Sequence, residues 1–140
     1  MVYKGFRLPQ DAALILFLTL RMLKYHLLLK RHSAHSVTLM IRSKSRAIPK
    51  QKHRNMDELT KCRKIVDHIL IRRLRFHKPC LLRSLTLLNE ALRRGIPADL
   101  CIGAKNEGST LAGHSWLEID GAPFMEDPGQ IAEYTRMTKE

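Results

Sequence analysis

A cysteine and a histidine in this 140-residue chain are of the types and in the settings that support nucleophilic catalysis. Cys80 follows Pro79 at the predicted first turn of an apolar helix, where unpaired N–H groups and the helix dipole favour a thiolate. His77 and Lys78 add positive charge beside the thiol. His114, at the predicted start of a strand after a glycine-rich loop, is placed to act as general base. Taken alone, each residue also fits an ordinary structural role.

A carboxylate is expected to orient the imidazole, as in other nucleophile–histidine–acid arrangements. Glu118 and Asp120 lie on the predicted strand of His114 and point past it. If this strand turns back as a hairpin, Glu126 or Asp127 returns beside His114, so we favour these two and leave the choice between them open. The alternative for each carboxylate is a solvated surface charge.

The hydrophobic pattern predicts that helices precede these residues. Apolar positions recur at three- and four-residue steps over Asp57–Phe76 and again over 80–95, and Pro79 and Gly95 suit the two ends of the second helix. A further helix is expected from about Gln10 to about Arg31. Residues 32–56 are expected to form a short helical or irregular piece followed by an exposed basic linker.

Strands are expected after Gly95, where the hydrophobic period changes. Residues 98–103 and 114–120 each read as a strand, residues 103–113 as a loop between them, and 123–126 as a third strand paired in a hairpin. The tail, 127–140, is expected to be a short helix or coil. Helices followed by antiparallel strands indicate an α+β fold.

The apolar segment Ala12–Leu29 is expected to be a buried or partner-facing helix, with an interfacial membrane helix as the alternative. Its run from Ala12 to Leu20 is too short to span a bilayer, because charged residues interrupt the rest of the segment. No small-residue cleavage site follows the run, so we predict neither a secretory signal nor a transmembrane segment.

Charge is distributed unevenly along the chain, whose formal net charge is +12. Residues 1–79 hold 19 basic and 4 acidic residues, whereas residues 80–140 hold 6 basic and 9 acidic residues. The basic half is expected to meet something anionic: a nucleic acid, a membrane surface or an acidic peptide.

The number and spacing of the three cysteines bear on disulfides and metal sites. Their odd number and wide spacing argue against a disulfide framework and favour a reducing, cytoplasmic setting. No CxxC pair is present, so no metal site and no cofactor are predicted. Cys62 and Cys101 lie at apolar positions and read as structural thiols, and Trp116 reads as a packing residue beside the histidine.

Two stretches together resemble a known family. Cys80–Gly103, which reads CLLRSLTLLNEALRRGIPADLCIG, and His114–Gly121, which reads HSWLEIDG, are similar to the stand-alone leader peptidases of lasso-peptide clusters, within the transglutaminase-like cysteine peptidases. The resemblance is dense over residues 80–134. Residues 1–79 share only helical and basic character with the family.

The resemblance implies a transglutaminase/papain-like core, with a cysteine-bearing central helix packed on a small antiparallel sheet. The core would span 57–140, preceded by an N-terminal helical, basic region over 1–56. Cys80 would be the nucleophile and His114 the base. Members of the family usually carry Asp where Glu126 falls here, and Asp127 is one residue further on, so the third position stays open between these two.

The family also implies a biological role and its partners. The substrate would be a leader–core precursor peptide, presented by a small leader-recognition protein in trans, after which an ATP-dependent lasso cyclase closes the core. Ala12–Leu29 would be a candidate docking surface for the recognition protein.

Two alternatives remain: another acyl transfer by the same triad, such as crosslinking or ligation, and a non-catalytic basic nucleic-acid-binding protein. Against the second, aromatic residues are only 6% of the chain and no nucleic-acid-binding motif is present, so we predict no nucleic-acid partner.

Overall fold

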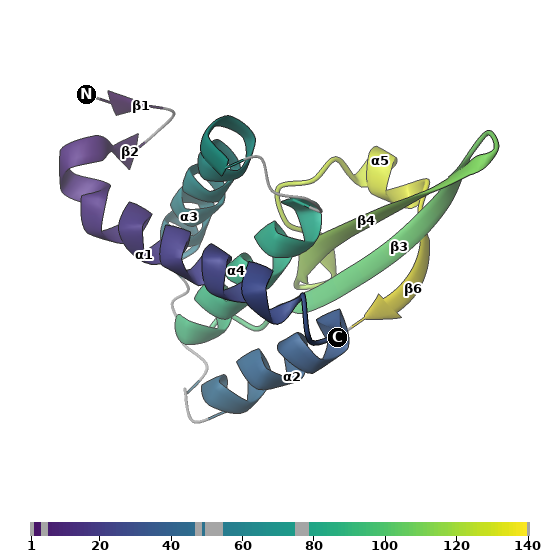
Figure 1. The fold of residues 1–140 in the computed structure, drawn as a ribbon, viewed down its shortest axis with the longest axis horizontal. Helices are drawn as coiled ribbons and strands as arrows, with labels where there is room; N and C mark the ends of the chain where they lie inside the picture. Colours follow the sequence, from purple (N-terminus) through teal and green to yellow (C-terminus); the bar gives the residue numbers. More distant parts are fainter. Residues whose placement is uncertain (1, 4–5, 47–48, 50–54, 75–78, 140) are drawn as a thin grey trace.

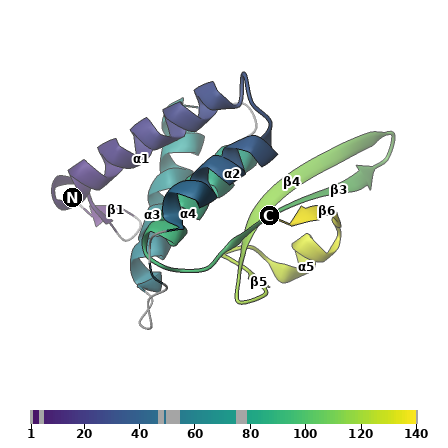
Figure 2. The ribbon, with the colours of Figure 1, turned by 90° about the horizontal axis from the view of Figure 1, so that it is seen from below.

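The computed structural model of the chain describes residues 2–3, 6–46, 49, 55–74 and 79–139 (Figure 1). It is an α+β fold with helices and a four-stranded antiparallel sheet, so the predicted fold class is confirmed. The helices gather on one side of the sheet, and a short C-terminal helix lies on the other (Figure 2). The helices are α1 (Leu8–Leu28), α2 (Ala34–Ser45), α3 (Met56–His68), the π-helix η1 (Ile69–Leu74), α4 (Pro79–Arg93) and α5 (Pro128–Ala132).

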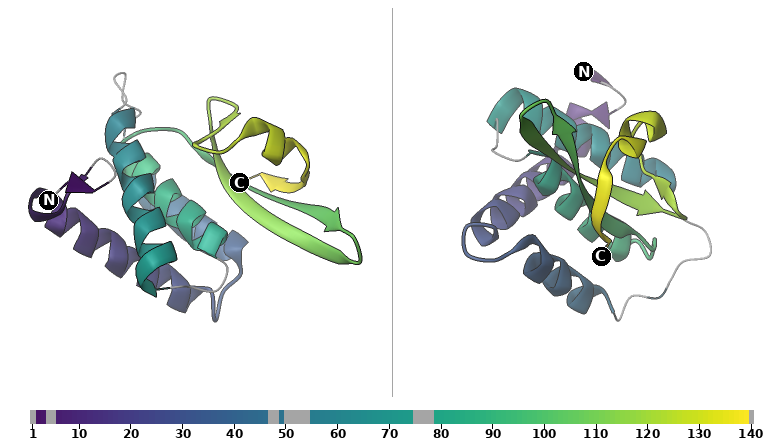
Figure 3. Two further views of the ribbon diagram at one scale, coloured as in Figure 1. Left: turned by 90° about the horizontal axis from the view of Figure 1, so that it is seen from above. Right: turned by 90° about the vertical axis from the view of Figure 1, so that its right-hand side faces the viewer.

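The central helix is α4, which contacts α1, α2 and α3 as well as strand β4 of the sheet (Figure 3). Pro79 begins the helix, and Gly95, just past its end, has a φ of 68°, a left-handed conformation that glycine adopts without strain. Both ends agree with the sequence-based prediction.

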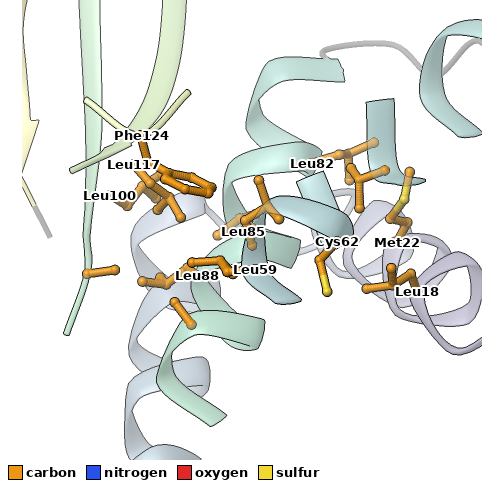
Figure 4. Close-up of a cluster of buried hydrophobic side chains, with 14 of the residues drawn as sticks. Leu18, Met22, Leu59, Cys62, Leu82, Leu85, Leu88, Leu100, Leu117 and Phe124 are labelled. Atoms are coloured by element: carbon orange, nitrogen blue, oxygen red, sulfur yellow. The ribbon is translucent and has the colours of Figure 1, made fainter. Parts of the chain in front are cut away.

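A continuous hydrophobic core lies between the helices and the sheet (Figure 4). Leu85 and Leu88 of α4 are completely buried there, with Leu59 of α3 on the helical side and Leu117 on the sheet side. Because α4 is covered by helices on one flank and by the sheet on the other, its first turn is held in a fixed position relative to the strands.

Helix α1 is apolar on two faces, and only one of them is used by the core. Leu18 and Met22 are buried, whereas Leu16, Leu20 and Leu27 are each more than half exposed. The predicted helix is therefore present, and its second apolar face lies at the surface. None of the helices in the described ranges combines the length and the apolar character that crossing a bilayer requires.

The N-terminal half agrees with the prediction in part. Residues 34–45 form a helix, α2, whose first turn is capped by Ser33, and a short helical piece was one of the two forms expected here. Helix α3 begins at Met56, after the Asn55 cap and close to the expected start at Asp57. From Ile69 to Leu74 the chain is a π-helix where an α-helix was expected, and the last two residues of the predicted helix, 75 and 76, lie outside the described residues. Most of the predicted basic linker lies outside the described residues.

The sheet has the strand order β5–β4–β3–β6, built from β5 (Ala122–Pro123), β4 (Thr110–Ile119), β3 (Asp99–Glu107) and β6 (Thr135–Lys139). A separate short pair joins β1 (Val2–Tyr3) to β2 (Phe6–Arg7). The expected loop over 103–113 was wrong: β3 and β4 pair without interruption to a tight turn at Gly108, whose φ is 64°. The polar composition of this stretch suggested a loop, but cross-strand pairing decides strand formation more than composition does.

The chain after residue 120 also departs in part from the prediction. The turn is present, with Asp120 and Gly121 both at positive φ, as primed hairpin turns require. The third strand is only two residues long, Ala122–Pro123. The tail forms α5, as expected, but then adds the strand β6 beside β3, which the sequence pattern did not indicate.

Candidate functional site

Cys80 lies in the first turn of α4, and its side chain is only partly buried. A hydrogen bond with His114 is the main cause that lowers the pKa of the thiol; burial acts in the opposite direction, and the backbone N–H of Ser115 lowers it again. Together these bring the pKa of Cys80 to about 7. A substantial fraction of the thiol is therefore ionised near neutral pH, which is the form that attacks a carbonyl.

His114 lies in the middle of β4 rather than at the start of a strand, because β4 begins at Thr110. Its ring is held against Trp116, with ring centroids 6.0 Å apart, and against Tyr134 at 5.4 Å. The hydrogen bond with Cys80, followed by the one with Glu126, raises the pKa of the imidazole to about 9 although burial opposes this. The thiol and the imidazole therefore favour the thiolate–imidazolium form at neutral pH.

The carboxylate beside His114 belongs to Glu126. Its Oε1 lies 3.5 Å from His114 Nε2. Because Nε2 faces the carboxylate, Nδ1 is the ring nitrogen left for the thiol. Burial would raise the pKa of Glu126, but the hydrogen bond with His114 and the charges of Arg83 and Arg63 outweigh it, so the pKa lies below its usual value.

Asp127, the other acid expected here, lies elsewhere. Its side chain accepts a hydrogen bond from the backbone N–H of Gly129 at 2.9 Å and caps the first turn of α5. The two acids are neighbours in the chain but have different surroundings. Asp127 is the N-cap of α5, whereas Glu126, one residue earlier, lies beside the histidine. The structure thus brings Glu126, and not Asp127, to His114.

Two arginines, not anticipated from the sequence, hold Glu126 in place. Arg83 Nη2 lies 2.9 Å from Glu126 Oε1, and Arg63 Nη2 lies 3.5 Å from the same atom. Asp67 joins the two arginines, at 2.8 Å from Arg63 Nε and 3.2 Å from Arg83 Nη1. Arg63 also donates to the backbone carbonyl of Phe124, two residues before Glu126. The carboxylate is therefore fixed by α3 and α4 together.

The arginines were missed because both lie within predicted helices, where the sequence pattern gives no sign of a distant partner. The available signal was that Arg63 and Asp67 are spaced i, i+4, the spacing of a helical ion pair, and that Arg83 lies one turn after Cys80. That signal does not identify a partner 43 or 63 residues away in the chain.

The other carboxylates and thiols considered lie apart from this cluster. Glu118 is buried and accepts hydrogen bonds from Trp116 and Arg136, while Asp120 is exposed in the turn after β4. Cys62 is buried in the core, and burial raises the pKa of its thiol to about 11. Cys101 is buried beside Trp116 on the outer face of the sheet, in a small cluster with Ile131 of α5.

Two residues expected near Cys80, His77 and Lys78, lie outside the described residues. In the part of the chain that is described, no cluster of three or more His, Cys, Asp or Glu side chains is arranged to hold a metal ion. The contacts among Cys80, His114 and Glu126 support acyl transfer through a thiolate, with a histidine to move the proton and a carboxylate to orient the histidine.

Comparison with protein families identifies the superfamily of the chain. The chain belongs to the transglutaminase-like superfamily, whose family model matches residues 19–139. No curated protein and no solved structure matches the chain significantly. The family match begins within α1, and the division of the chain at residue 56 stays a prediction.

Proposed function

We propose that this member of the transglutaminase-like superfamily is a cysteine peptidase that uses Cys80, His114 and Glu126. Superfamily members are typically cysteine peptidases or acyltransferases. The single observation that supports the proposal most is the convergence of three segments on one chain of contacts: thiol to imidazole, and imidazole Nε2 to the Glu126 carboxylate at 3.5 Å.

The reaction follows from the two protonation states. The Cys80 thiolate attacks the scissile carbonyl carbon, and the backbone N–H of Cys80, in the first turn of the helix, is a candidate donor to the oxyanion. The imidazolium of His114 then gives its proton to the leaving amine, and the C–N bond breaks to leave a thioester on Cys80. Water, deprotonated by the now neutral His114, attacks the thioester, and the carboxylic acid product leaves as the C–S bond breaks, which restores the thiolate–imidazolium pair.

Glu126 has the role of orienting the imidazole and stabilising its positive charge. A carboxylate on Nε2 fixes the ring so that Nδ1 faces the thiol, and it makes the protonated imidazole more favourable. Asp127, which caps α5, has no part in this proposal.

The substrate that we propose is the leader peptide of a lasso-type precursor. This rests on the similarity of residues 80–103 and 114–121 to leader peptidases. A small leader-recognition protein would present the precursor in trans, and an ATP-dependent cyclase would use the freed core. All of these would be present in the cytoplasm. The exposed leucines of α1 offer the recognition protein an apolar surface in a region that is otherwise basic.

Mass measurement tests the function directly. The chain is incubated with a candidate precursor and its recognition protein, and hydrolysis is expected to give two fragments whose masses add to the precursor plus one water. Cys80→Ala is expected to abolish cleavage while circular dichroism and the unfolding midpoint stay unchanged. Cleavage by Cys80→Ala at the wild-type rate would refute the assignment of the nucleophile.

A second candidate, acyl transfer to an amine, is favoured by the same thioester and by membership of the superfamily. It differs only in the group that attacks the thioester. Transfer would join two chains with loss of the leaving amine and no gain of water, so the same mass measurement separates the two reactions.

A further inference from the structure

Strand β4 presents an edge of the sheet beside the thiol. On the side away from β3, β4 pairs with β5 only through Glu118 and Ile119. Among the described residues, no other strand pairs with this side of β4, although the strand itself extends back to Thr110. The hairpin of β3 and β4 accordingly projects beyond the rest of the sheet (Figure 1).

One hydrogen bond shows which main-chain groups of β4 point toward this edge. Phe124 donates its N–H to the carbonyl of Leu117 at 2.8 Å, so the main-chain groups of Leu117 point away from β3. The main-chain groups of successive residues alternate in direction along a strand, so those of Ser115 and Gly113 point the same way as those of Leu117. The hydrogen bond from the Ser115 N–H to the Cys80 thiol agrees with this, and it places the thiol at the edge.

Gly113 is the next residue of this set, and it is open to solvent. A Cβ added there would meet only the carbonyl oxygen of Gly103, at 4.0 Å, within its own sheet. By contrast, a Cβ added at Gly103 would lie 3.0 Å from side-chain atoms of Trp116 and Tyr134. Gly113 is thus exposed with room above it, and within the described part of the chain no strand pairs with its outward N–H and C=O, which lie on the same edge as the thiol.

We propose that the peptide substrate binds as an added strand on the exposed edge of β4, with one residue paired to the N–H and C=O of Gly113. The inference rests on the proposed peptidase function and assigns it a main-chain subsite. Gly113 and Ser115 are two residues apart, about 6.8 Å along a strand. The substrate residue paired with Gly113 is therefore about two residues from the bond that reaches Cys80.

This mode of binding recognises main chain and leaves the side chains of the substrate largely unread. It suits an enzyme whose precursor is selected by a separate recognition protein, because strand addition requires only an extended peptide with free main-chain N–H and C=O groups. It also requires a peptide stretch free of proline at the paired residue, because that residue must donate an N–H.

Two variants at one position test the subsite. Proline is tolerated on an edge strand where the missing N–H faces away from the sheet, so Gly113→Pro is expected to keep the unfolding midpoint while lowering kcat/KM for precursor cleavage about tenfold or more. Gly113→Ala keeps the N–H and has room for its methyl group, so it is expected to lose much less activity than Gly113→Pro. Equal activity of both variants would overturn the proposal.

Substrate analogues provide the matching half of the test. Once mass measurement has located the cleaved bond, synthetic precursors are methylated at one backbone nitrogen at a time. A sharp loss of cleavage is expected at one position about two residues from the cut, in addition to any effect at the cut bond itself. Uniform cleavage of all analogues methylated away from the cut bond would contradict strand addition.

Amide hydrogen exchange separates failure of this inference from failure of the function. In the Cys80→Ala variant, uncleaved precursor with its recognition protein is expected to slow exchange of the Gly113 amide, and that of Thr110 much less, since Thr110 faces β3. If Gly113 is protected but the wild type does not cleave the precursor, strand addition at β4 is supported and the proposed peptidase function is refuted. Cleavage without protection of Gly113 would refute the binding edge alone.

Discussion

Replacing Arg83 by glutamine tests whether the arginines position the histidine through its acid. Arg83 Nη2 and His114 Nε2 share one atom, Glu126 Oε1, at 2.9 Å and 3.5 Å. In Arg83→Gln the carboxylate keeps its weaker interaction with Arg63, also at 3.5 Å, while the shorter one is removed. We expect the carboxylate to move and the imidazole to become less firmly oriented.

The expected magnitude depends on the kind of hydrogen bond that the substitution removes. A hydrogen bond between charged groups contributes about 1.5–3 kcal/mol, and the retained interaction with Arg63 places the expected effect near the lower end, about 1.5–2 kcal/mol. At about 1.4 kcal/mol per factor of ten, kcat/KM should fall roughly 10- to 30-fold. Both side chains of the pair are less than one fifth exposed, so screening by solvent and salt removes little of this effect.

The direction of the pH dependence distinguishes positioning from general damage. The hydrogen bond with Glu126 helps to raise the pKa of His114, so a carboxylate that has moved away should let that pKa fall, and the alkaline limb of the pH profile should move below about 9. The assay is kcat/KM for precursor cleavage between pH 5 and pH 10, at about one-unit intervals or finer.

Arg94→Gln is the matched control for Arg83→Gln. Arg94 lies just past the end of the same central helix with a similar exposed fraction, 19% against 17%, but pairs with Glu90 and Glu58 instead. We expect it to lower the unfolding midpoint without moving the pH limbs. If Arg83→Gln stays within twofold of wild type, or if both variants show the same drop in activity with unchanged limbs, the positioning role is refuted.

Three further predictions concern the rest of the chain. Cleavage should rise with pH through about 7, where Cys80 ionises, and fall through about 9, where His114 releases its proton; a profile still rising at pH 10 would contradict the pair. Leu20→Glu on the exposed face of α1 should weaken binding of the recognition protein, measured by calorimetry, whereas Met137→Glu on β6, also at a largely exposed residue, should not. Leu88→Ala, at a completely buried position of α4, should lower the free energy of unfolding in urea by about 3 kcal/mol; a decrease below about 1 kcal/mol would show that this core position is not tightly packed.

Local patterns in the sequence predicted the parts of the fold that local forces decide. The three-residue and four-residue apolar spacing located α3 and α4, and Pro79 with Gly95 marked both ends of α4. Placing Cys80 at a helix start needed no knowledge of any other segment. The same reasoning was less successful for the strands: the pairing of β3 with β4 through the polar stretch before His114, and of β6 with β3, depends on partners rather than on local composition.

The residues proposed for the chemistry could be named from the amino-acid sequence alone: a thiol at a helix N-terminus, a histidine ahead of a hairpin, and two neighbouring acids. Which acid faces the imidazole depends on tertiary contacts, because Asp127 is taken up by the cap of α5 while Glu126 is held by Arg83 and Arg63. The physical reason is the difference in sequence separation between local and tertiary interactions. Capping and periodicity act over three or four residues, whereas the contacts that fix Glu126 join segments 43 and 63 residues apart, and such contacts exist only once the core has formed.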